Sequence, residues 1–139
     1  MLRRRDATQA TLAWFAKRPF DWGKAATCVH MIRRHITKLG HRPPPMPAFR
    51  SALGAKKALQ GKGWGSLSEM MDGVLPAIPP AHAVLSDVVE LPSDDAVFGA
   101  LCIVIGNGRV MGYFEGAGDM LTVMQPLAPP LRAWSVQGG

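Results

Sequence analysis

Apolar residues recur every three or four positions in the first half of the chain, which is the spacing of one helix face. The strongest stripe predicts a helix over residues 24–39, which Gly40 is well placed to end. The outer side of this helix carries basic residues, so we expect its other side to pack against the core. That apolar side consists of Cys28, Ile32, Ile36 and Leu39.

Three shorter helices are predicted around this one. The first follows Asp6, which can cap it, and ends before Pro19, because the residue before a proline avoids the helical region. The second covers about 48–60 and follows a proline-rich connector over 43–47 that cannot form a regular helix. The third covers 66–73 and begins with a Ser-x-x-Glu capping box.

Beyond residue 80 the pattern changes to strands. The nearly continuous apolar run over 98–105 predicts a central strand, and the Gly-Asn-Gly over 106–108 predicts a tight hairpin after it. Because helices come first and antiparallel strands afterwards, the predicted class is α+β, with N-terminal helices packed on a C-terminal antiparallel β-sheet. The other predicted strands cover 83–91, 109–114, 121–125 and 133–136.

Length and composition fit one domain spanning residues 1–139. Hydrophobic residues make up 47% of the chain, enough for a packed core, so disorder along the whole chain is not expected. No apolar run approaches the roughly 20 residues that a membrane span needs. The cationic start over 1–5 is followed by polar residues rather than an apolar segment, so no secretion signal is expected.

The net charge of +6 is distributed unevenly. Residues 1–62 hold 14 Lys/Arg and two Asp/Glu, whereas residues 63–139 hold two Lys/Arg and eight Asp/Glu. Opposite charges of this size can attract each other within the fold or face different partners. Nucleic-acid binding by the basic half is disfavoured, because no helix-turn-helix, zinc-finger or aromatic-basic pattern accompanies the charge.

Several short motifs occur in a specific order. An aromatic-x-Trp-Gly loop over 20–23 precedes Cys28, a Ser-Asp-Val-Val follows over 86–89, an apolar strand over 101–106 ends in Gly, and an Ala-Trp-x-Val closes at 133–136. This order resembles small NlpC-type cysteine-peptidase-like proteins of phages, prophages and gene-transfer agents. The resemblance implies a papain-like fold and makes Cys28 the candidate catalytic nucleophile.

The chain departs from that pattern at positions that matter for catalysis. Active relatives carry a histidine where the strand leading to Gly-Asn-Gly begins, and the matching position here is Ala100. The next strand offers no polar residue over 110–113 suited to orient a histidine, and Thr27 stands where the family usually has Asp. These departures therefore favour a degenerate site, in which Cys28 is a vestigial thiol rather than a working nucleophile.

None of the four histidines matches a catalytic position, and each is expected to be solvated or locally hydrogen-bonded. His30 points elsewhere on the helix than Cys28, His35 lies about two turns on, and His41 follows the helix end. His82, which precedes the Ser-Asp-Val-Val strand, stays open as a substitute base.

Two cysteines, Cys28 and Cys102, form no Cys-x-x-Cys pair, so neither a metal knuckle nor a disulfide framework is expected. Both are interpreted as buried, reduced thiols, and no cofactor or metal is predicted. The position of Cys28 near a helix start favours its thiolate, because the positive end of the helix dipole lies there.

The function expected from the resemblance is that of a structural component of a phage or prophage tail, at the tail tip or hub. Its partners would be other tail proteins, with peptidoglycan as a further candidate, and it would reside in the virion after synthesis in the bacterial cytoplasm. Two alternatives stay open. One is an active peptidoglycan-cleaving cysteine peptidase or amidase that uses Cys28, and the other is a basic nucleic-acid-binding module.

Overall fold

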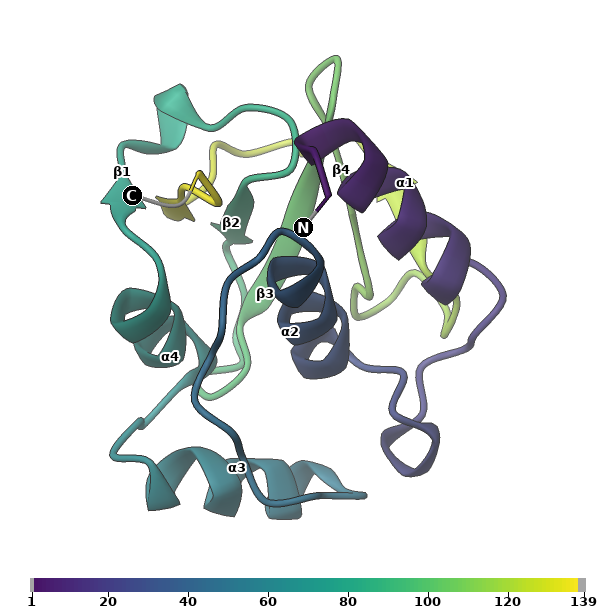
Figure 1. The fold of residues 1–139 in the computed structure, drawn as a ribbon. Helices are drawn as coiled ribbons and strands as arrows, with labels where there is room; N and C mark the ends of the chain where they lie inside the picture. The colour runs from purple at the N-terminus through teal and green to yellow at the C-terminus, as the bar shows by residue number, and fades with distance from the viewer. Residues whose placement is uncertain (1, 138–139) are drawn as a thin grey trace.

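A computed structural model describes residues 2–137. Four helices lie on one side of a six-stranded antiparallel sheet with the strand order β1-β6-β2-β3-β4-β5 (Figure 1), which confirms the predicted α+β class. The helices are α1 (Arg4–Phe15), α2 (Cys28–Lys38), α3 (Ala52–Gly61) and α4 (Leu67–Val74), with 3-10 turns η1 (Trp22–Lys24) and η2 (Pro80–His82). The strands are β1 (Ala77–Ile78), β2 (Val88–Leu91), β3 (Ala100–Gly106), β4 (Arg109–Gly112), β5 (Thr122–Met124) and β6 (Arg132–Trp134). None of the helices in the described part has the length and apolar character of a membrane span.

Helix α2 is the central helix, and it starts four residues later than predicted. Residues 21–26 close into a small loop instead, in which Asp21 pairs with Ala26 and Ala25 adopts a left-handed φ of 55°. The side chain of Thr27 then caps the helix, so Cys28 becomes its first residue. At the other end Gly40, with a φ of 94°, ends the helix as predicted.

Helix α1 also differs from its prediction. It begins at Arg4 with Arg3 at the cap position, and no side chain caps it, so Asp6 lies in the first turn rather than at the cap. An acidic residue in the first turn still interacts favourably with the helix dipole. In α4 the predicted Ser66 cap is present, since Ser66 accepts the backbone N–H of Glu69 at 3.1 Å, but the Glu69 carboxylate accepts the N–H of Gly65 rather than that of Ser66.

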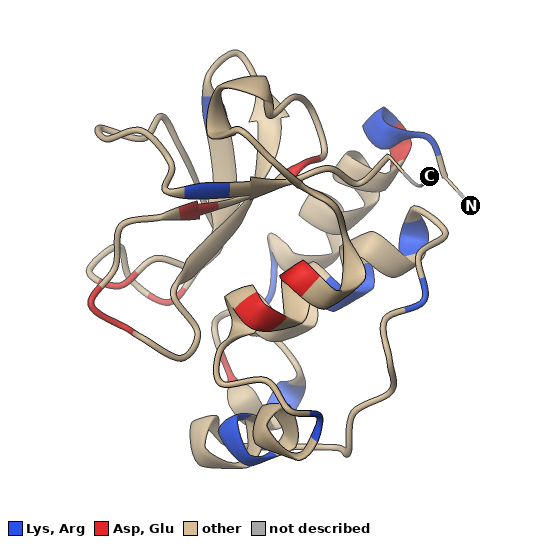
Figure 2. Cartoon of the chain, turned by 90° about the vertical axis from the view of Figure 1, so that its left-hand side faces the viewer, with Lys and Arg blue, Asp and Glu red and all other residues tan. Residues whose placement is uncertain are grey.

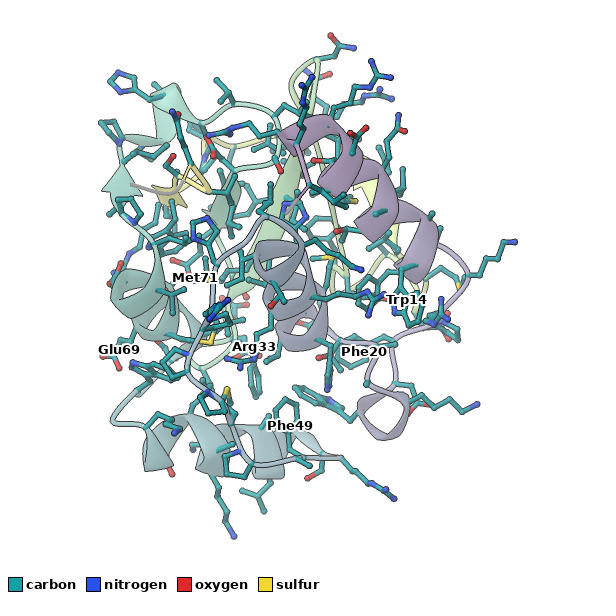
Figure 3. The ribbon with its side chains drawn as sticks, in the orientation of Figure 1. Trp14, Phe20, Arg33, Phe49, Glu69 and Met71 are labelled. Atoms are coloured by element: carbon teal, nitrogen blue, oxygen red, sulfur yellow. The ribbon has the colours of Figure 1, made fainter. Side chains whose placement is uncertain are left out.

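The sheet separates two apolar clusters because successive strand residues face opposite sides. In β3, Leu101 and Ile103 pack against the helices in the main core, whereas Cys102 belongs to a smaller cluster on the other face. The proline-rich connector over 43–47 lies on the helix side of the sheet. It is held to α2 by Arg33, whose Nη2 donates to the Pro44 carbonyl at 2.9 Å (Figure 3).

A buried carboxylate joins the first helix to the sheet. Asp87 is 1% exposed and accepts three hydrogen bonds, from Arg4 Nη1 at 2.8 Å and from the backbone N–H groups of Val84 at 2.9 Å and Val136 at 3.0 Å. Arg4 also donates to the Leu85 carbonyl. The strongly basic first half of the chain and the acidic second half therefore meet through this ion pair inside the fold.

His35 forms a second buried link between helices and sheet. Its Nε2 lies 2.9 Å from the Ser86 carbonyl oxygen, and its Nδ1 lies 2.9 Å from the Thr11 hydroxyl. Because a carbonyl only accepts, Nε2 carries the proton and Nδ1 is left as an acceptor, which shares the single Thr11 hydroxyl proton with the Ala7 carbonyl. The expectation of a solvated or locally bonded side chain is wrong here, since α2 turns this position into the core.

Replacing Asp87 by Asn should lower the free energy of unfolding by about 3 kcal/mol, because Arg4 then loses its buried partner. Asp94→Asn is the matched control: Asp94 is exposed, so its substitution should change stability by less than about 0.5 kcal/mol. Urea unfolding of the three proteins measures both values. Equal stability of the two variants would contradict the role of Asp87.

Burial lowers the pKa of His35 to about 4. The Ser86 carbonyl and Asp87 raise this pKa, but by less than burial lowers it. Between pH 6.5 and 4 the unfolded chain therefore binds a proton that the folded chain does not. Stability should fall by about 3 kcal/mol as the pH decreases through this window and stay level, for this group, below it. Urea unfolding at pH 7 and pH 4 should show this loss in the natural chain and not in His35→Gln; equal losses in both would count against it.

Candidate functional site

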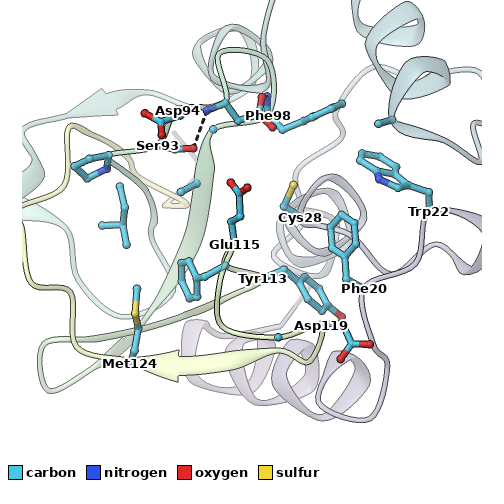
Figure 4. Close-up of a pocket in the computed structure, with 18 residues that line it drawn as sticks. Phe20, Trp22, Cys28, Ser93, Asp94, Phe98, Tyr113, Glu115, Asp119 and Met124 are labelled. Carbon is cyan, nitrogen blue, oxygen red and sulfur yellow. Dashed lines mark hydrogen bonds between the residues drawn. The ribbon is translucent and has the colours of Figure 1, made fainter.

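A pocket of about 670 Å³ opens where the N-terminal end of α2 meets the end of the sheet (Figure 4). Its walls come from the loop before α2, the β2–β3 loop, the β4–β5 loop, and the first residues of α2 and α3. The site is therefore assembled from segments far apart in the sequence. Cys28, the first residue of α2, thereby shares the pocket with the end of β2 and the beginning of β3.

Cys28 occupies this pocket as a protonated thiol. The side chain is 8% exposed and its sulfur points into the cavity (Figure 4). Burial is the main cause that raises the pKa of the thiol to about 12; nearby Asp95 contributes to the rise, and the backbone N–H groups at the helix start lower the pKa too little to compensate. The helix start does favour the thiolate, as expected, but the loss of water on burial destabilises the charged form by more, so Cys28 is the buried, reduced thiol that the sequence predicted.

No histidine lines the pocket within residues 2–137. His30 Nδ1 is bonded to the Thr27 hydroxyl at 2.7 Å, which confirms its predicted local bond. His41 bonds the distant Val136 carbonyl, so its predicted solvated or local state is wrong. His82 is exposed in η2, next to β1 at the opposite edge of the sheet order from β5, and is not part of the pocket wall.

Ala100 lies where the resemblance places the catalytic histidine, at the first residue of β3 and on the pocket wall. Its side chain packs against the Cys102 cluster, on the sheet face away from the helices. A methyl group can neither accept nor donate a proton. Among the residues that line the pocket, Cys28 therefore has no imidazole to ionise it.

Sequence reasoning missed the residues that give this pocket its charge. Asp94, Asp95, Glu115 and Asp119 all line it. It also missed Tyr113, whose hydroxyl donates to the Arg18 carbonyl at 2.8 Å and whose pKa burial raises to about 12. A usable signal was present for the four acidic residues, because they lie in the loops between predicted strands, and loops at strand ends commonly carry binding residues.

The fold is that of a papain-like NlpC-type domain. The crystal structure of the NlpC/p60 domain of the peptidoglycan hydrolase SagA superposes with a TM-score of 0.59 at 15% sequence identity, covering 96% of this chain and 99% of that one. At this identity the likeness shows the fold alone. The family model described as a domain of unknown function, DUF6950, matches residues 2–136, and the chain belongs to that family.

One curated protein also shares a stretch of sequence with this chain. Glutamate-1-semialdehyde 2,1-aminomutase of Dichelobacter nodosus is 28% identical over 95 residues, which cover 68% of this chain and 20% of that protein. The chain thus spans about a fifth of the length of the curated relative that it matches. This stretch assigns no activity to the pocket described above.

Iodoacetamide should modify Cys28 in the folded protein on the order of 10³-fold more slowly than in the unfolded chain at pH 7.5, because so little thiolate is present. Cys102 is the internal control, since burial also raises its pKa to about 12. Peptide mapping by mass spectrometry, with and without guanidinium, measures both rates. Rapid modification of Cys28 while Cys102 stays protected would reveal an activated nucleophile.

Proposed function

We propose that this protein is a non-catalytic structural component of a phage or prophage tail, at the tail tip or hub, with a degenerate cysteine-peptidase-like site. The observation that carries the non-catalytic part is the state of Cys28. Its thiol is buried, its pKa is raised to about 12, and no histidine shares its pocket in the described residues.

Hydrolysis by a cysteine needs more than a thiol. A base must remove the thiol proton and later return a proton to the leaving amine, while backbone donors stabilise the oxyanion. The charged groups of this pocket are carboxylates, and negative charge beside a thiol opposes its ionisation, as Asp95 does for Cys28. The pocket is thus electrostatically unsuited to a nucleophilic cysteine.

The tail assignment is supported by the motif order that the chain shares with phage and prophage NlpC-like proteins. It agrees with a surface suited to contacts of opposite sign: basic residues lie mainly on the helices and their connectors, and acidic residues on α4, β2 and the sheet loops (Figure 2). The proposed partners are other tail subunits and, as a bound surface rather than a substrate, peptidoglycan. The proposed location is the virion, after synthesis in the bacterial cytoplasm.

A second candidate function is favoured by the position of Cys28 on the wall of an open pocket in an NlpC/p60-like fold. In that case the protein would be a peptidoglycan-cleaving cysteine peptidase or amidase whose base comes from a neighbouring subunit. The two candidate functions can be distinguished by enzymatic activity, because only under the second would the assembled particle cleave peptidoglycan.

The purified chain should release no soluble fragments from peptidoglycan and should not cleave short cell-wall peptides, because Cys28 lacks a base. The Cys28→Ala and His82→Ala variants should give the same background, and the SagA NlpC/p60 domain serves as the positive control. Cleavage that both substitutions abolish would show that His82 activates Cys28. Cleavage only by assembled particles, lost in Cys28→Ala, would favour the second candidate.

Purified virions or tail particles should contain this chain in a fixed copy number, because a structural subunit assembles stoichiometrically. Quantitative mass spectrometry of gradient-purified particles measures the ratio to a major tail protein. Free monomer in the lysate together with its absence from particles would contradict the tail assignment and leave the non-catalytic chemistry of the pocket untouched.

A further inference from the structure

The charged lining of the Cys28 pocket has one sign. Four of the chain's ten acidic residues line it, and none of its 16 Lys/Arg does. This is notable in a protein with a net charge of +6, in which a random set of charged residues would be mostly basic. The four are Asp94, Asp95, Glu115 and Asp119.

These carboxylates are not used by ion pairs within the described residues. The ion pairs found there are Arg4–Asp87 and Arg132–Glu90, both outside the pocket lining. Asp95 accepts the backbone N–H groups of residues 97 and 98, each at 2.9 Å, and so shapes the β2–β3 loop. All four pocket carboxylates belong to exposed residues, so they can meet a ligand at the rim of the pocket.

Aromatic rings form the wall beside Cys28. Phe20 and Tyr113 have ring centroids 5.6 Å apart, and Trp22 and Phe98 have centroids 5.1 Å apart. The Cys28 thiol, 8% exposed, points between these rings and the acidic loops (Figure 4). A pocket with aromatic walls, an uncharged buried thiol and an acidic rim suits a cation on an apolar stem.

The protein makes contacts between cations and aromatic rings elsewhere on its own surface. The guanidinium carbons of Arg18 and Arg34 lie 3.9 Å and 3.6 Å from the centroid of the Trp14 ring. Arginine stacked on an exposed aromatic ring is thus a contact that this chain already makes. In the pocket the rings are present and carboxylates stand beside them, but no cation of the described residues lines it.

We infer that this pocket docks a Lys or Arg side chain from an extended segment of a partner protein, the cation lying between the aromatic wall and the acidic rim. The volume of about 670 Å³ accommodates several residues rather than one side chain, and falls in the roughly 300–1,000 Å³ range of binding pockets. The inference rests on one part of the proposed function, namely that this pocket is non-catalytic, and it adds the chemical class of the ligand. It does not depend on the partner being a tail protein.

The test uses the full chain and the capped peptide Ac-Gly-Ala-Arg-Ala-Gly-NH₂, with a citrulline peptide as the neutral isostere of arginine. NMR titration should give shifts around Trp22 and Phe98 and an affinity about tenfold higher for arginine than for citrulline, decreasing with salt. Glu115→Gln and Asp119→Asn should each weaken arginine binding several-fold. Asp6→Asn, which removes an exposed carboxylate on α1, should not.

Each other outcome overturns the inference in a recognisable way. Equal binding of both peptides, or shifts confined to other surfaces, would exclude a cation-selective pocket. Binding of acetyl-arginine amide as tight as that of the peptide would exclude an extended segment. Concentration-dependent self-association that Glu115→Gln abolishes would make a second copy the occupant. Peptide cleavage lost in Cys28→Ala would instead refute the proposed non-catalytic function.

Discussion

The buried carboxylate of Asp87 is the constraint on which the arrangement of this protein depends. It takes hydrogen bonds from Arg4, from the turn before β2 and from the chain after β6, so one side chain joins the start, middle and end of the sequence. Next to it, Ser86 accepts from the buried His35 of α2. A buried carboxylate that has lost its hydration requires such hydrogen-bond partners, and the positions of these partners fix how the helices pack against the sheet.

That packing decides the chemistry of Cys28. Packing α2 against β3 places the thiol at the start of a helix and surrounds it with aromatic residues and acidic loops. Burial and negative charge both favour the neutral thiol, and the helix start does not outweigh them. The fold of an NlpC/p60 domain thus surrounds a pocket in which the thiol is buried and neutral.

Much of the fold could be predicted because it follows from local patterns. The Ser66 cap, the Gly40 stop, the proline-rich connector and the 106–108 hairpin are short-range features, and each lies where it was predicted. The predictions were wrong where longer-range contacts outweighed the local sequence preferences. Helix α2 starts at Cys28 because the 21–26 loop closes on itself, and the two-residue strand β1 exists only through its pairing with β6.

For the site, the sequence alone determined the α+β order, since the order of helical and strand patterns carries that information, and its motif order carried the resemblance that implies Cys28 as candidate nucleophile and Ala100 at the histidine position. Only the tertiary structure decided the protonation of Cys28, the buried links of His35 and the meeting of Asp94, Glu115 and Asp119 around one cavity. The physical reason is that desolvation and charge–charge interactions depend on which distant segments exclude water together, and that is a property of packing rather than of local sequence.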